Sequence, residues 1–243
     1  MAQSAEPKNV GKWYAEKMGW KLSSGNVMVE GTTDVAYFEL ASRLHFEKTG
    51  MRLLDNNLSV FASGLEDEGG AYGIQDSFPT LFNLNRLDTD TNGRVKYRLI
   101  ALFDDDDIGR SAMNSLLYVN RLVKEYVSVF LLRRAMPLMP LVPAELGKLT
   151  AQQNQAFAGA NCTIEDLLSD ALSRRFLSGS QNVLARPLDP AIQTLHLPWN
   201  LAGKAQLREF AQKTATWNDV EGLVNTLRAL RSYVGLPPEG SAS

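Results

Sequence analysis

Uninterrupted apolar runs alternate with amphipathic segments through residues 1–135, and this alternation restricts the fold more than any other feature. Four such runs occur, at 26–30, 58–63, 98–103 and 127–132. Strands that are apolar on both faces are typical of parallel sheets whose crossover helices cover them. We therefore expect an α/β fold with a mainly parallel four-stranded sheet flanked by helices.

The remaining segments predict helices, loops and one ambiguous insertion. Residues 64–73 predict a loop, and a helical or hairpin insertion is expected over 74–98. Helices are expected at 9–21, 34–48, 108–124, 163–177, 202–214 and 218–234. The chain divides accordingly into an N-terminal helix (1–23), an α/β core (24–135), a helical C-terminal part (136–236) and a flexible tail (237–243).

The content of charged residues, cysteine and histidine excludes several kinds of site. With one cysteine, Cys162, and two histidines, His45 and His196, the chain can form neither an internal disulfide nor a Cys-rich or multi-histidine metal centre. A metal ion would need oxygen ligands. The net charge of −2 is unusual for a protein whose main function is to bind nucleic acid. No secretion signal or membrane-spanning stretch occurs, so we expect a cytoplasmic protein without membrane contact.

Acidic side chains follow two of the apolar runs. Glu30 ends the first run, with Asp34 four residues later, and Asp104 and Asp106 follow the third. Ligands bind beyond the carboxyl ends of parallel strands, and alternate residues of an extended chain point the same way. We therefore expect Asp104 and Asp106 to face Glu30. Carboxylates this close repel one another unless a cation neutralises them, and Mg²⁺ prefers such oxygen ligands.

Acids at a strand–helix junction have a second interpretation. They also serve as helix N-caps and stabilise the positive end of the helix dipole. Asp107 is the expected cap of the helix that begins at 108, and Asp105, like Asp107, is expected to point away from the site.

The two acidic segments together resemble the TOPRIM domain of topoisomerases, primases, recombination proteins and OLD-family (overcoming lysogenization defect) nucleases. They read VMVEGTTDVAYFEL (27–40) and LIALFDDDDIGRSAMN (99–114), each a strand followed by Glu-Gly-x-x-Asp or Asp-x-Asp-x-x-Gly. CTIEDLL (162–168) and Gly203-Lys204 are similar to further segments of the OLD nucleases, so the resemblance covers residues 24–235. Unlike those nucleases, these 243 residues contain no Gly-x-x-x-x-Gly-Lys-Ser/Thr phosphate loop and so lack their ATPase domain.

The resemblance implies a TOPRIM (Rossmann-like) core and an endonuclease that hydrolyses phosphodiester bonds with two Mg²⁺ or Mn²⁺ ions. It assigns catalysis to Glu30, Asp104, Asp106 and Lys204. It assigns metal binding to Glu30, Asp34, Asp104, Asp106 and Glu165, with Asp166 as the alternative to Glu165. Ordinary roles remain open, because Thr163 followed by acids also begins a helix, and Lys204 can be a surface lysine.

The resemblance also implies partners. The substrate would be a nucleic acid, with DNA expected ahead of RNA. Because OLD-type systems control cleavage with an ATPase, we expect a partner ATPase and a role as effector of prokaryotic anti-phage defence; a homo-oligomer stays open. Two bound divalent ions would change the net charge to +2, so the charge does not exclude a nucleic-acid substrate. Phosphate contacts need cations, and the candidates are Arg110, Arg133, Arg134, Arg174 and Arg175, with Arg121 and Lys124 as further members.

Two other functions fit parts of the pattern. A non-catalytic TOPRIM module could bind metal or a partner and regulate it. A haloacid-dehalogenase-type phosphatase also ends a strand in Asp-x-Asp, but on the first strand rather than the third. Asp88 to Gly93 matches half of an EF-hand loop without the final glutamate, so an Asn-Gly turn is expected there. Cys162 is expected to be a small buried residue, and His45 to be a packing or surface residue.

Overall fold

The computed structural model describes residues 9–64, 69–187 and 196–242. Its centre is a four-stranded sheet of β1 (Gly25–Val29), β3 (Leu58–Ala62), β4 (Arg98–Phe103) and β5 (Val129–Leu131). The strand order is β3-β1-β4-β5, and every neighbouring pair is parallel. This arrangement confirms the α/β fold and the parallel four-stranded sheet.

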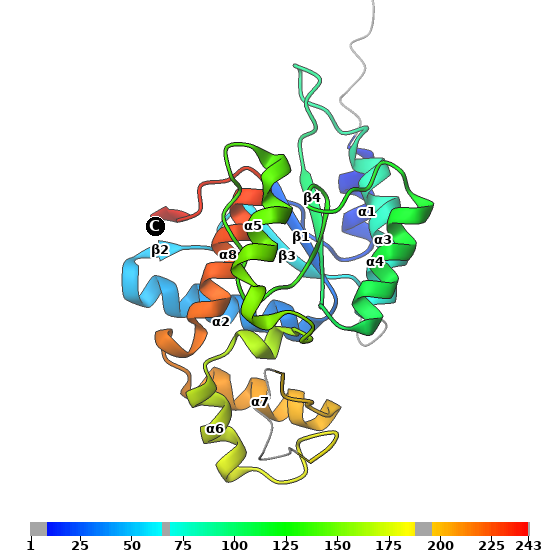
Figure 1. The fold of residues 1–243 in the computed structure, drawn as a ribbon. Coiled ribbons are helices and arrows are strands. Elements are labelled where there is room, and N and C mark those ends of the chain that lie inside the picture. Colours follow the sequence, from blue (N-terminus) through cyan, green and yellow to red (C-terminus); the bar gives the residue numbers. More distant parts are fainter. Residues whose placement is uncertain (1–8, 65–68, 188–195, 243) are drawn as a thin grey trace, which may run out of the picture.

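Helices cover both faces of the sheet (Figure 1). Val27, Val29 and Ile100 point into one core with α2 (Thr32–Thr49) and α8 (Glu221–Tyr233). Met28 and Phe103 point into the other, which is closed by α1 (Val10–Lys17), α3 (Gly70–Asn85) and α4 (Asp107–Val119). Successive strand residues therefore enter opposite cores, which explains why each strand is apolar throughout.

The C-terminal part is helical, as the sequence predicts. It contains α5 (Leu146–Gln153), α6 (Asp170–Gly179) and α7 (Leu201–Thr214), and α6 and α7 lie side by side in Figure 1. Short 3₁₀ helices connect them: η1 (Pro143–Glu145), η2 (Gln155–Phe157), η3 (Ile164–Leu167) and η4 (Trp217–Val220). The helix expected at 163–177 is two helices, because Ser169 caps α6 by accepting a hydrogen bond from the N–H of Leu172.

Other elements also differ from the sequence expectation. Residues 65–68 of the loop expected at 64–73 lie outside the described residues, and α3 already begins at Gly70. The helix expected to reach 124 ends at Val119. The insertion contains both α3 and a hairpin, whose Thr89–Val95 bridge closes the expected Asn-Gly turn. The segment expected to be a flexible tail ends in β6 (Ser241–Ala242), which pairs antiparallel with β2 (Met51–Arg52). No helix among the described residues is long and apolar enough to cross a membrane.

Candidate functional site

Glu30 and Asp104 lie side by side at the carboxyl edge of the sheet. Glu30 directly follows β1 and Asp104 directly follows β4, the neighbouring parallel strand. The backbone N–H of Asp104 donates a 2.9 Å hydrogen bond to Oε1 of Glu30. Gly109 makes this approach sterically feasible, because a Cβ there would lie 2.0 Å from the carbonyl oxygen of Asp104 and 3.3 Å from Oε1 of Glu30. The two acidic motifs therefore meet.

Asp34 and Glu165 complete a group of four carboxylates. Asp34 lies in the first turn of α2, where its Oδ2 accepts a 2.8 Å hydrogen bond from the N–H of Gly31. Glu165 lies in η3 and is 2% exposed. Its Oε2 accepts a 2.8 Å hydrogen bond from the hydroxyl of Thr163, whereas its buried Oε1 has no partner among the described residues. We call Glu30, Asp34, Asp104 and Glu165 the carboxylate cluster.

Lys204 is the cation of this cluster. Its Nζ lies 3.4 Å from Oε2 of Glu165 and its side chain is 34% exposed. Burial alone would lower the lysine pKa, but the charges of Glu165, Asp104 and Asp34 raise it overall, so Lys204 stays charged. Gly203 allows the first turn of α7 to pack against the backbone of Val183, because a Cβ at Gly203 would lie 2.0 Å from the carbonyl oxygen of Val183. The Gly-Lys pair thus places one positive charge beside four acids.

The carboxylates share more negative charge than Lys204 can neutralise. Burial raises the pKa of Glu30 to about 7, with a further upward contribution from the charge of Asp106. Burial, followed by the charges of Glu165 and Glu30, raises the pKa of Asp34 to about 7. Burial and the charges of Asp34, Glu30 and Glu165 raise the pKa of Asp104 well above its usual range. Buried like charges of this kind favour either bound protons or a bound cation.

The other aspartates after β4 have separate roles. Asp106, not Asp107, is the N-cap of α4, since its Oδ1 accepts a 2.7 Å hydrogen bond from the N–H of Gly109; the cap expected at Asp107 is wrong. Asp107 is fully in solvent and pairs with Arg110 at 2.7 Å. Asp105 points away from the cluster, as expected, and is buried between Arg110 and Arg133. Asp106 remains close enough to Glu30 to raise its pKa.

Asp166 lies beside the cluster but faces other partners. Its Oδ2 accepts a 2.8 Å hydrogen bond from the N–H of Thr163, and Nδ1 of His196 lies 2.7 Å from the same oxygen. Arg134 pairs with its Oδ1 at 3.3 Å. Of the two adjacent acids, Glu165 is therefore the one that the structure brings to Lys204.

Most of the arginines expected to form a basic rim are engaged in ion pairs. Arg110 and Arg133 hold Asp105, Arg134 holds Asp166, and Arg175 lies 3.1 Å from Asp219. Arg174 is exposed on α6 and has no ion pair within the described part of the chain, which is also true of Arg121 and Lys124. The expected rim is not a continuous patch of unpaired cations.

Arg208 lies next to the cluster without belonging to any motif. It is half-buried on α7, one turn after Lys204, and its Nη1 donates to Oγ1 of Thr33 at 3.4 Å. In the part of the chain that the structure describes, no carboxylate lies within ion-pair distance of it. The spacing of Lys204 and Arg208 is the one sequence signal that could have identified it, since residues four apart share a helix face.

The donor set of the cluster suits a hard divalent cation. As the side chains stand, no three His, Cys, Asp or Glu residues of the described chain form a group that could hold a metal ion. Glu30, Asp34 and Glu165 each direct one oxygen at an internal donor. The partnerless Oε1 of Glu165 and the uncompensated negative charge nevertheless match the oxygen ligands that Mg²⁺ takes.

Comparisons with known proteins give no relative for this chain: no protein-family model, no curated protein and no solved structure matches it. The resemblance to TOPRIM domains therefore depends on the motifs and on the geometry described above.

Proposed function

We propose that this chain is a divalent-metal-dependent nuclease of the TOPRIM type that hydrolyses phosphodiester bonds. One observation carries the proposal: four carboxylates from separate segments converge at the carboxyl edge of a parallel sheet, where a single lysine leaves them under-neutralised. A protein keeps such mutual repulsion at a cost in stability, and perturbed carboxylates in this position are typical of functional sites.

The ligands for Mg²⁺ or Mn²⁺ would be Glu30, Asp34, Asp104 and Glu165, with Asp106 contributing the oxygen that does not cap α4. A bound ion lowers the pKa of an attacking water and stabilises charge on the phosphate, and a second ion stabilises the leaving oxygen. The convergence of four acids provides enough carboxylate oxygens for two ions that also keep several waters.

The chain's own residues supply the remaining functions. Lys204, held beside Glu165, offers a positive charge where negative charge develops on the phosphate. Arg208, which has no acidic partner among the described residues, offers a guanidinium to bind a flanking phosphate. In the protein without metal, burial raises the pKa of Glu30 to about 7, so this carboxyl group can hold a proton near neutral pH until a metal ion binds it.

We further propose a nucleic-acid substrate, DNA ahead of RNA, and control by a partner ATPase in a cytoplasmic anti-phage system. Four of the five arginines expected to contact phosphate are held in ion pairs, and this supports a need for that partner, because phosphate binding depends on available cations.

A non-catalytic regulatory module is the second candidate. It is favoured by the observation that the carboxylates, as they stand, satisfy internal donors rather than forming a metal-holding group. In that function the cluster would bind metal or a partner without cleavage.

The deciding experiment incubates the purified protein with single- and double-stranded DNA and with tRNA, in Mg²⁺, Mn²⁺ or EDTA, alone and with the proteins encoded by flanking genes. We expect metal-dependent cleavage that falls about 100-fold or more in Asp104→Asn. Asp107→Asn, whose exposed side chain is at the first residue of α4, should cleave like wild type. Equal cleavage by wild type and Asp104→Asn contradicts a nuclease site here, and metal binding without cleavage under every condition favours the regulatory module.

A further inference from the structure

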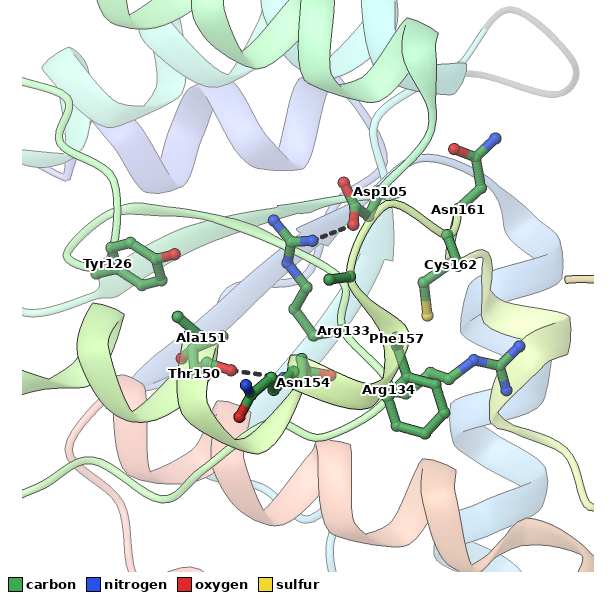
Figure 2. Close-up of a pocket in the computed structure, with 13 residues that line it drawn as sticks. Asp105, Tyr126, Arg133, Arg134, Thr150, Ala151, Asn154, Phe157, Asn161 and Cys162 are labelled. Carbon is green, nitrogen blue, oxygen red and sulfur yellow. Dashed lines mark hydrogen bonds and ion pairs between the residues drawn. The ribbon is translucent and has the colours of Figure 1, made fainter. Parts of the chain in front are cut away.

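A cavity of about 300 Å³ lies behind the loop that carries Asp104 (Figure 2). Its walls come from α5, from η2, from the segment after β5 and from the Asn161–Cys162 segment before η3. The volume is at the lower end of the range for small-molecule sites. No role in the proposed cleavage reaction involves this cavity.

A short backbone bridge separates the cavity from the carboxylate cluster. The N–H of Asp105 donates to the carbonyl of Cys162 at 2.9 Å, and the N–H of Cys162 donates to the carbonyl of Asp105 at 3.0 Å. On one side, Asp104 directly precedes Asp105 and Glu165 follows Cys162 by three residues, and both Asp104 and Glu165 belong to the carboxylate cluster. On the other side, the side chains of Asp105 and Cys162 line the cavity. The bridge therefore ties both acidic segments to one wall of the cavity.

The cavity wall carries two ion-paired arginines, since Arg133 pairs with Asp105 and Arg134 with Asp166. Of the described residues that line it, two are arginines, Arg133 and Arg134, and one is an acid, Asp105. The Arg133 guanidinium points across the cavity to Asp105, and the hydroxyl of Tyr126 points toward the same guanidinium (Figure 2). Asp105 is also held by Arg110 at 2.8 Å, so this one buried carboxylate pairs with two guanidinium groups.

The rest of the lining combines small and apolar residues with the polar side chains of Thr150, Asn154, Gln155 and Asn161. Ala151, Ala158 and Ala160 leave the space open, and the ring of Phe157 forms one side with the Arg134 guanidinium 5.4 Å above it. An organic group can therefore fill the cavity while an anionic group reaches Arg133.

We propose that this cavity binds a small phosphomonoester and that its occupation is communicated to the carboxylate cluster through the Asp105–Cys162 bridge. A phosphate monoester suits the site better than a carboxylate. A carboxylate ligand would only replace the Asp105 carboxylate as the partner of Arg133. A phosphate carries close to two negative charges and three acceptor oxygens for the planar donors of arginine. Drawing Arg133 from Asp105 shifts the bridge, and with it the positions of Asp104 and Glu165.

Binding is tested by titration calorimetry in phosphate-free buffer with EDTA and without nucleic acid, so that it does not depend on the proposed nuclease activity. The probes are adenosine 5′-monophosphate and ribose 5-phosphate, with adenosine and ribose as phosphate-free counterparts. We expect both phosphate esters to bind, each about tenfold or more tightly than its counterpart. A 5′-phosphorylated trinucleotide distinguishes the source: affinity equal to that of the monophosphate indicates a strand end, and weaker binding indicates a free phosphomonoester.

Two variants locate the site. Arg133→Gln should weaken binding by about tenfold or more, because it removes the charged donor. Ala158→Trp, at an exposed position on the cavity wall, should block binding while Arg133 and Asp105 stay paired, so it serves if the first variant unfolds. Arg94→Gln, exposed and outside the lining, is the matched control and should bind like wild type. No binding of either ester, or wild-type affinity in both cavity variants, overturns the proposal.

Communication between the cavity and the carboxylate cluster is measured by backbone amide shifts in NMR spectra. This measurement is independent of the proposed nuclease activity, and only the effect of cavity binding on cleavage rests on the proposed function. Saturating adenosine 5′-monophosphate should shift the amides of Asp104 and Glu165 as well as those of Asp105 and Cys162. None of these shifts should occur in Ala158→Trp. Shifts confined to α5 and η2 overturn the communication between the two sites.

Discussion

The backbone N–H of Asp104 donates a hydrogen bond of 2.9 Å to Oε1 of Glu30. This bond joins the ends of β1 and β4, so the first turns after two parallel strands share one acidic site. Among the described residues, Oε2 of Glu30 has no hydrogen-bond partner. One oxygen of the glutamate thus holds the loop of Asp104, and the other is available to the site.

Glu30→Gln separates these two roles. Glutamine keeps an Oε1 that can accept from the N–H of Asp104 but loses the charge, so the fold should persist while cleavage falls about 100-fold or more. Single-turnover cleavage and thermal unfolding measure the two effects. Glu39→Gln, exposed on α2, is the control and should match wild type in both. Wild-type cleavage by Glu30→Gln would remove Glu30 from the mechanism.

The metal-free protein should lose stability as the pH rises. Burial raises the pKa of Asp34 from 3.8 to about 7, so the folded state binds this proton more tightly than the unfolded state does. The stability that this group contributes is complete below about pH 4 and is lost as the pH rises through about 7. Asp34→Asn keeps an acceptor for the N–H of Gly31 and carries no charge. We expect it to exceed wild type by about 2 kcal/mol in free energy of unfolding at pH 8.

Urea unfolding in EDTA at pH 5 and pH 8 measures this difference. Asp76→Asn, exposed on α3, should follow the pH dependence of wild type. If Asp34→Asn and wild type lose equal stability between the two pH values, Asp34 does not carry the raised pKa.

A divalent cation should reverse this loss. Mn²⁺ or Mg²⁺ neutralises the cluster only in the folded state, and at about 100-fold excess over Kd it should add roughly 3 kcal/mol to the free energy of unfolding. The gain should be larger at pH 8 than at pH 5.5, because below pH 7 protons compete for Glu30 and Asp34. Thermal unfolding with and without metal measures it. Glu165→Gln should lose most of the gain, whereas Glu209→Gln, exposed on α7, should retain it. A metal effect independent of Glu165 would place the ion elsewhere.

The strands and the meeting of Glu30 with Asp104 could be predicted from the sequence because both follow from local patterns. Apolar runs indicate buried parallel strands, and the ends of such strands share one edge of the sheet. The identity of the helix cap could not be predicted in the same way. Asp106 and Asp107 are equally suitable caps, and the choice depends on the residue at which the backbone becomes helical.

Long-range partners explain the remaining differences. Arg133 meets Asp105 across 28 residues, and Arg208 meets Thr33 across 175 residues. Neither pair has a periodicity or spacing that a sequence pattern can reveal. From the sequence, Arg133 is therefore expected to be available for phosphate although it pairs with Asp105. Arg208, which has no acidic partner among the described residues, lies far from the acidic motifs in the sequence and is not identified by them.

Arg208 should affect substrate binding more than the chemical step. It lies one turn from Lys204 on α7 and has no carboxylate within ion-pair distance among the described residues, so its charge is available for a phosphate. Lys204 is instead committed to Glu165 at 3.4 Å. We expect Arg208→Gln to raise KM about tenfold with little change in kcat, and Lys204→Gln to lower kcat.

Steady-state cleavage at several salt concentrations separates these effects. Removing one phosphate contact should reduce the slope of log(kcat/KM) against log[salt] by about one for duplex DNA. Lys213→Gln, an exposed change of the same charge on the same helix, is the control and should keep the wild-type KM and slope. A fall in kcat without a change in KM or slope for Arg208→Gln would show that Arg208 holds the α2 turn through Thr33 and does not bind the substrate.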